Sequence, residues 1–184
     1  MAKRKPDRLE MEEIDKICEQ ADLLGDDFYI TLLNIMRYTG RRISEYTALQ
    51  VKDVNLEKGS MNMWILKRKQ KIQRETILNE FCVKLLRVYI LKNKLKLDDY
   101  LFRTNSIRAI QRRIKKFAVD AGINKNVSPH SFRHYFVTSL LKQGWGYDKI
   151  SKLTGHASPA TLVHYDDIIA EDIREDTLAA LDRF

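Results

Sequence analysis

Apolar residues recur at helical spacing through the first quarter of the chain. A first helix is predicted from Met11, Ile14, Ile17, Cys18 and Ala21, and a second from Phe28, Leu32, Ile35 and Met36. Gly40 follows the second run and is a common residue at the end of a helix. A short third helix is expected from about residue 42 to residue 50.

The apolar pattern changes to that of strands after Val51. The segments MNMWILK and KIQRETIL are rich in strand-forming residues, and the turn-forming sequence EKGS precedes the first of them. We therefore expect an antiparallel sheet of two or three strands within residues 51–78. Its second turn is expected to contain Lys67, Arg68, Lys69, Gln70 and Lys71, which would form a basic hairpin tip.

Helical spacing returns from Asn79, and a polar connection separates this helix from those that follow. Ser106 is suited to cap a helix that ends before Gly122, and Ser128 with Pro129 to begin another that runs to Gly144. Further helices are expected from Ser158 and Pro159 and over residues 168–181, where an apolar face opposes an acidic one. The fold class predicted is mainly α with a small antiparallel β-sheet (α+β), as one domain over residues 1–184.

Charge and composition narrow the possible partners. A formal net charge of +8 and a pI near 9.4 favour a polyanion. Basic residues concentrate between residues 67 and 74 and again at Arg108, Arg112, Arg113, Lys115 and Lys116. The sequence has neither a long apolar run nor a secretory signal, and its two cysteines lack metal-site spacing. These features predict a cytoplasmic protein without a membrane segment.

Four short segments could carry chemistry: TGRRISE at 39–45, HSFRH at 130–134, LTGHAS at 153–158 and HY at 164–165. His130 and Arg133 lie three positions apart on one helix face, so both can address one anion. A metal site of His130, His134 and His156 is the alternative. The HExxH motif is absent, however, and a cationic arginine stands between the two helical histidines. Paired acids are sequence neighbours, which disfavours a two-metal nuclease. We therefore expect neither a metal nor another cofactor.

Together these segments resemble the active-site motifs of tyrosine recombinases and integrases, the family of Xer recombinases, lambda-type integrases and Cre-type enzymes. The resemblance covers about residues 9 to 170 and implies the catalytic-domain fold of DNA breaking-rejoining enzymes. Residues 40–45 match the pattern Gly-x-Arg-aliphatic-Ser/Gly-Glu and make Arg42 the first catalytic arginine. His130 and Arg133 match His-x-x-Arg, and Gly155 with His156 matches Gly-His.

The resemblance also implies a nucleophile and a general acid. Tyr165 lies nine residues after His156, the usual spacing of the family's nucleophile. The family's catalytic lysine commonly lies five residues before an arginine, which points to Lys69 before Arg74. The glycines that usually flank this lysine are absent, so Lys67 and Lys71 remain alternatives.

The resemblance implies a reaction on DNA and a role in it for each site residue. Transesterification through a 3′-phosphotyrosine would need Arg42, Arg133 and His156 at the phosphate, His130 as proton acceptor and Glu45 to orient a cation or histidine. Double-stranded DNA is the expected partner. Its phosphates would be contacted by Lys67, Arg68, Lys71, Arg108, Arg112 and Arg113.

Assembly and domain content can also be anticipated from the resemblance. Family members generally carry an amino-terminal DNA-binding domain, which we expect this chain to lack. We expect a homo-oligomer, a tetramer on DNA, to form through residues 168–184. A type IB topoisomerase and a non-catalytic DNA-binding module are the competing interpretations.

Overall fold

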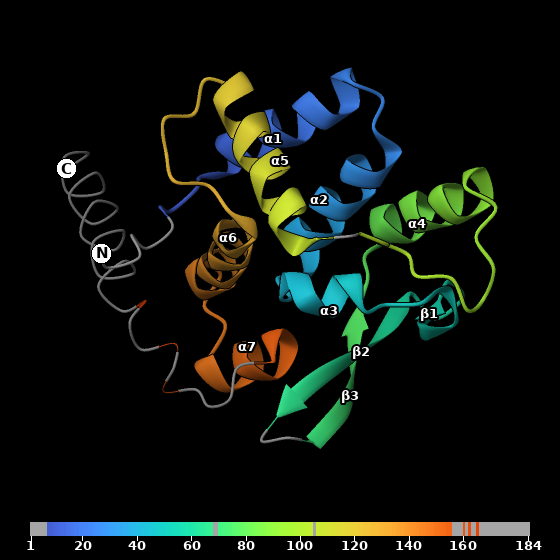
Figure 1. Cartoon of the computed structure of the whole chain (residues 1–184). Helices are drawn as coiled ribbons and strands as arrows, with labels where there is room; N and C mark the ends of the chain where they lie inside the picture. Colours follow the sequence, from blue (N-terminus) through green and yellow to red (C-terminus); the bar gives the residue numbers. More distant parts are fainter. Residues whose placement is uncertain are drawn as a thin grey trace. The chain divides into compact units, whose positions relative to one another are not determined.

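The computed structural model describes residues 7–67, 70–104, 106–155, 160, 162 and 165. The chain divides into two compact units, unit 1 over residues 1–136 and unit 2 over residues 137–184. Figure 1 shows the order of their elements along the chain. Within the described ranges, no helix is long and apolar enough to cross a lipid bilayer.

Three helices form the main helical layer of unit 1. Helix α1 (Met11–Leu23) packs against α2 (Asp27–Thr39) and α5 (Ile107–Asp120), as both ribbon views show. Asp26 caps α2 by accepting a hydrogen bond from the backbone N–H of Tyr29, and Ser106 caps α5 in the same way at Arg108. The core between these helices contains Ile14, Ile17, Leu32, Leu33, Ile110, Ile114 and Phe117.

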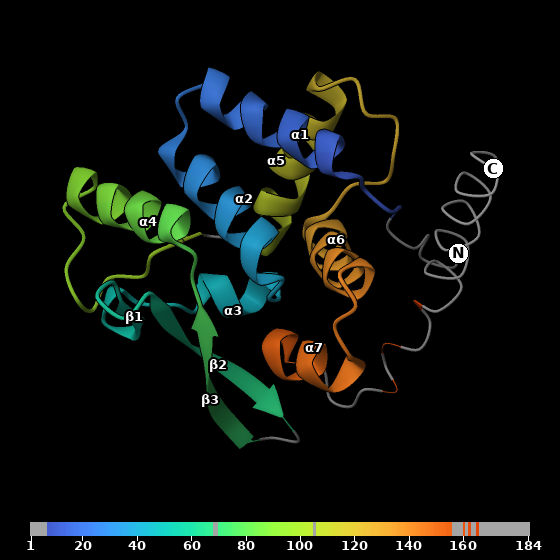
Figure 2. The ribbon, with the colours of Figure 1, turned by 180° about the vertical axis from the view of Figure 1, so that it is seen from behind.

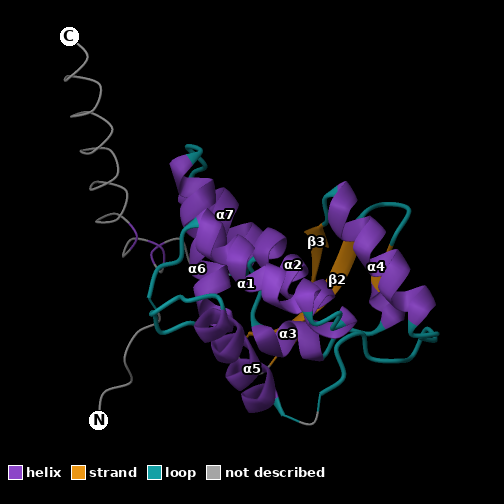
Figure 3. Cartoon of the chain, turned by 90° about the horizontal axis from the view of Figure 1, so that it is seen from above, coloured by secondary structure: helices purple, strands orange, loops and turns teal. Residues whose placement is uncertain are grey.

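A small sheet follows the short helix α3 (Ile43–Thr47) and the 3₁₀ turn η1 (Val51–Asp53). Strands β1 (Val54–Asn55), β2 (Ser60–Lys67) and β3 (Gln70–Ile77) form an antiparallel sheet in that order. Met61 and Met63 on β2 are buried, and α3 packs against the same strand. Helix α4 (Glu80–Lys92) begins after Asn79, which caps it, and packs against α2. Figure 3 shows β2 and β3 beside this group of helices.

Two boundaries differ from the sequence expectation. The third helix ends at Thr47 rather than near residue 50, because Gln50 pairs with Tyr100 as an isolated bridge. The expected five-residue basic turn was also too wide. Lys67 pairs with Gln70 in the register of β2 and β3, and Leu66 pairs with Lys71. Lys67, Gln70 and Lys71 are therefore strand residues, which leaves only residues 68 and 69 between the strands.

Helix α6 (Pro129–Lys142) and helix α7 (Tyr147–Thr154) complete the described elements. In unit 2, buried Val137, Ile150, Leu162 and Tyr165 form one hydrophobic cluster. Helix α7 was not predicted, because the eight residues between Gly146 and Gly155 make only about two helical turns. Of the helix expected from Ser158 and Pro159, the structure describes only residues 160, 162 and 165, and the helix expected over 168–181 lies outside the described residues. The predicted class, mainly helical with one small antiparallel sheet, is confirmed.

Candidate functional site

The turn between α2 and α3 places Arg42 at the start of a helix. Gly40 ends α2 in the left-handed region at φ 57°. One carboxylate oxygen of Glu45 accepts the backbone N–H of Arg42 at 3.3 Å, and the other accepts Nη1 of Arg42 at 3.2 Å. Glu45 is only 5% exposed, whereas the Arg42 side chain is 44% exposed. A buried carboxylate thus holds a cation that a ligand can still reach.

The first turns of α6 supply His130 and Arg133. Ser128 opens the helix, because its Oγ accepts the backbone N–H of His130 at 3.2 Å. Arg133 is 2% exposed, and its Nη1 donates to the carbonyl oxygen of Gly40 at 2.9 Å. This hydrogen bond joins the Arg133 helix directly to the turn that carries Arg42.

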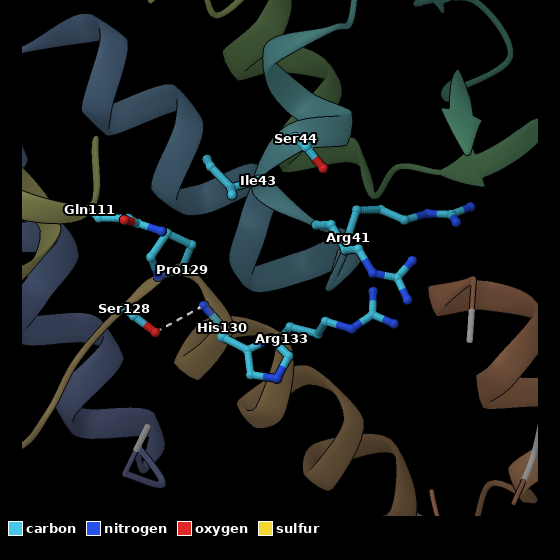
Figure 4. Close-up of a pocket in the computed structure, with 9 residues that line it drawn as sticks. Arg41, Ile43, Ser44, Gln111, Ser128, Pro129, His130 and Arg133 are labelled. Carbon is cyan, nitrogen blue, oxygen red and sulfur yellow. Dashed lines mark hydrogen bonds between the residues drawn. The ribbon is translucent and has the colours of Figure 1, made fainter. Parts of the chain in front are cut away.

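Arg42, His130 and Arg133 line one pocket with a volume of about 290 Å³. Figure 4 shows Gln111 and Ser128 on one side of it and Arg133 on the other, with Ser44 at its edge. The pocket is lined by Arg41, Arg42, Ile43, Ser44, Gln111, Ser128, Pro129, His130 and Arg133. None of these lining residues is acidic. The pocket is therefore suited to an anion, which arginine guanidinium groups can bind through paired hydrogen bonds.

Arg41 is a member of this pocket to which the sequence analysis gave no function. Its side chain is 1% exposed and reaches β3, where Nε donates to Oγ1 of Thr76 at 2.9 Å and Nη2 to the carbonyl oxygen of Glu75 at 3.3 Å. Burial lowers the pKa of Arg41. The signal that could have found it is the first arginine of TGRRISE, which directly precedes Arg42.

Of the remaining expected catalytic residues, the structure describes Tyr165. Tyr165 is 2% exposed and packs with Val137, Ile150 and Leu162 inside unit 2. Lys69 and His156 lie outside the described residues, as does Arg68, and the description does not extend to the side chains of Lys67 and Lys71. The structure therefore brings Arg42, His130 and Arg133 to one pocket.

The histidine pair on α6 was the basis of the metal alternative. The rings of His130 and His134 meet edge to face, with centroids 4.5 Å apart. Over the described part of the chain, no group of three histidine, cysteine or acidic side chains is arranged to hold a metal ion. His156, the third ligand of that alternative, is not among those residues.

The arginines of α5 divide into two kinds. Arg108 and Arg112 are exposed. Arg113 instead lies over the ring of Phe117, with its guanidinium carbon 4.9 Å from the ring centroid, and its Nη2 lies 3.8 Å from Oδ2 of Asp26. These contacts direct Arg113 toward the protein, which argues against its expected role at a DNA phosphate.

The fold matches those of solved recombinases. The structure aligns with XerA recombinase at a TM-score of 0.78 and 30% identity, over 96% of this chain and 67% of that one. It aligns with XerH site-specific recombinase in a pre-cleavage complex with difH substrate at 0.73 and 26% identity, over 89% and 51%. The domain therefore has the fold of a recombinase catalytic domain.

The sequence comparison identifies the family. The model of the phage integrase family matches residues 7–171, so the chain belongs to this family, and the expectation from the motifs is confirmed. Tyrosine recombinase XerD of Staphylococcus epidermidis is 29% identical over 182 residues, which cover 94% of this chain. The chain spans 62% of the length of that relative.

Proposed function

We propose that this chain is the catalytic domain of a site-specific DNA recombinase that cuts and rejoins double-stranded DNA in the cytoplasm. The observation that carries the proposal is the anion pocket, where Arg42 meets His130 and Arg133 from a distant part of the sequence. Family membership supports the same chemistry, and the XerH relative was solved on a DNA substrate.

In this proposal the pocket holds the phosphate that is cut. Attack on a phosphodiester concentrates negative charge on its two non-bridging oxygens. Arg42 and Arg133 donate hydrogen bonds to those oxygens and keep their charge at any working pH. The hydrogen bonds to Glu45 and to the Gly40 carbonyl hold the two guanidinium groups before the substrate arrives. Fixed donors of this kind stabilise the transition state without reorganising.

The nucleophile is Tyr165. A tyrosine hydroxyl has a pKa of about 10 in water, so it reacts faster when a base accepts its proton. His130 accepts that proton, Tyr165 Oη bonds to phosphorus, and the bond from phosphorus to the 5′ oxygen breaks. Lys69 protonates the departing 5′ oxygen, and His156 adds a donor at the phosphate. The 3′-phosphotyrosine retains the bond energy, and a 5′ hydroxyl of a second strand reverses the step.

DNA reaches this site along basic residues, of which Arg108 and Arg112 are exposed. Arg108 and Arg112 on α5 contact backbone phosphates, together with Lys67, Arg68 and Lys71 of the hairpin. The Tyr165 side chain is buried with Val137, Ile150 and Leu162, so cleavage requires its hydroxyl to become accessible to the phosphate.

A suicide substrate with a nick beside the cleavage site tests the proposal. The nicked fragment diffuses away after cleavage, so protein becomes covalently attached to DNA. We expect this adduct with the natural chain, none with Tyr165→Phe, and normal levels with Tyr147→Phe, a partly buried tyrosine of the same unit. No adduct with the natural chain, on DNA that it binds, would leave the non-catalytic module as the better interpretation. Relaxation of supercoiled plasmid without strand exchange would favour the topoisomerase.

We further propose that residues 168–184 join protomers into a tetramer on DNA, because the sequence there pairs an apolar face with an acidic one. A chain ending at residue 167 should still form the covalent adduct and should fail to bring two DNA sites together. Retained synapsis in a gel-shift assay would contradict the assignment.

A further inference from the structure

The buried guanidinium of Arg41 has no acidic hydrogen-bond partner among the residues that the structure describes. Its Nε and Nη2 groups donate to two neutral acceptors, the Thr76 hydroxyl and the Glu75 carbonyl. Its Nη1 group is buried and makes no hydrogen bond within that same part of the chain. A cation removed from water in this way is costly unless something supplies the opposite charge.

Glu45, the carboxylate beside Arg41, does not supply the hydrogen-bonded negative charge that would balance this cation. Glu45 is close enough to favour the charged form of Arg41, but both its oxygens are used by Arg42. Arg42 and Arg74 add positive charge close by and act, with burial, to lower the pKa of Arg41. The neighbourhood therefore holds more positive than negative charge, and Arg41 lines the anion pocket.

We propose that Arg41 is a third arginine of the phosphate pocket, whose charge is balanced by the bound phosphodiester rather than by an acid of the protein. This inference rests on the proposed function, because a DNA phosphate is the anion assigned to the pocket. Its bonds to β3 keep the guanidinium fixed, so its charge is already in place when the phosphate binds.

The two possible roles of Arg41 predict opposite changes in stability. If Arg41 served only to attach the α2–α3 turn to β3, replacing it would weaken the fold. If the charge of Arg41 is balanced only when phosphate is bound, the unliganded protein contains an uncompensated buried cation. Replacing Arg41 by a neutral side chain of similar length then leaves the stability of the unliganded protein unchanged or raises it. The same replacement then lowers affinity for an anion.

Arg41→Met tests the inference, with Arg87→Met as the matched control. Arg87 is exposed on α4, so the control makes the same change in net charge away from the pocket. Inorganic phosphate is the probe, and its affinity is obtained from the rise of Tm with phosphate concentration. We expect Arg41→Met to bind phosphate about tenfold to a hundredfold more weakly, the loss typical of one hydrogen bond to a charged group. Arg41→Lys should recover part of the affinity.

Each outcome decides the inference. A lower Tm for Arg41→Met than for Arg87→Met in the absence of phosphate would make Arg41 a structural residue. Equal phosphate affinity in the two variants would also overturn the inference. Neither result affects the covalent adduct of the natural chain on the suicide substrate, so the proposed function would stand. A natural chain that forms no adduct would refute the function, and the phosphate comparison would still show whether Arg41 binds the anion.

Discussion

Gly40→Ala is expected to destabilise the fold at the turn between α2 and α3, which a hydrogen bond joins to Arg133. A Cβ atom on Gly40 would lie 2.3 Å from Cδ1, 2.7 Å from Cγ and 2.9 Å from Cβ of Phe136. These atoms lie at the base of the Phe136 side chain, next to its backbone, so they cannot move aside as the end of a flexible side chain can. The residue also has φ 57°, where an alanine is strained.

The two costs can be separated with a second glycine. The left-handed conformation costs alanine about 1–2 kcal/mol, and forcing extra volume into a packed contact costs about 1–3 kcal/mol. Gly40→Ala should therefore lose about 2–5 kcal/mol of unfolding free energy. Gly25 has nearly the same φ of 59°, but a methyl group added there would meet no atom within 4 Å, so Gly25→Ala should lose only the first amount.

Urea unfolding followed by circular dichroism measures both variants. Phe136→Ala removes the two nearest ring atoms, so the double variant Gly40→Ala/Phe136→Ala should lose less than the sum of the single changes. Equal losses for Gly40→Ala and Gly25→Ala, or strict additivity with Phe136→Ala, would refute the contact. Because Arg133 donates to the Gly40 carbonyl, adduct formation on the suicide substrate should also fall.

Two further results are expected. Tyr46 is fully buried, and its hydroxyl meets Oγ1 of Thr39 at 2.7 Å and accepts the backbone N–H of Arg41 at 2.9 Å, so Tyr46→Phe should cost about 1–3 kcal/mol in urea unfolding. Tyr38→Phe, at an exposed tyrosine, should change stability by less than about 0.5 kcal/mol. Burial raises the pKa of Cys18 and of Cys82 from 9.0 to about 12, so neither thiol should react with a thiol reagent before unfolding. The unfolded chain loses these protons first, so their contribution to stability is present below pH 9.0 and declines toward about pH 12; a urea midpoint that did not fall in this range would contradict the burial.

Much of the fold follows from local patterns in the sequence. Helical spacing and capping residues such as Ser106 and Asn79 indicate where α5 and α4 begin, and both residues do cap those helices. The lengths of β2 and β3 were harder to predict, because the basic residues between Leu66 and Ile72 are typical of a turn. The pairing of Lys67 with Gln70 across the hairpin shows that both are strand residues. Such pairing depends on the register with the partner strand, which the local sequence does not reveal.

The site was predicted in part for a similar reason. Arg42, His130 and Arg133 stand in recognisable motifs, and all three line the pocket. Arg41 was given no function because it occupies the variable position of the Gly-x-Arg pattern. Its burial depends on the neutral acceptors at Glu75 and Thr76, which no spacing rule connects to residue 41. The packing of Arg113 on the ring of Phe117 likewise could not be predicted from the sequence, because it depends on the folded structure.

The hydrogen bond between Arg133 and the Gly40 carbonyl spans 93 positions of the chain. During synthesis, the first arginine of the site leaves the ribosome long before the helix that completes it, and contacts between distant residues form slowly. A nascent or prematurely terminated chain that ends before residue 133 therefore has half of an anion site. Such a fragment lacks the guanidinium that Arg133 contributes to the pocket of the folded domain, so its affinity for an anion should be lower.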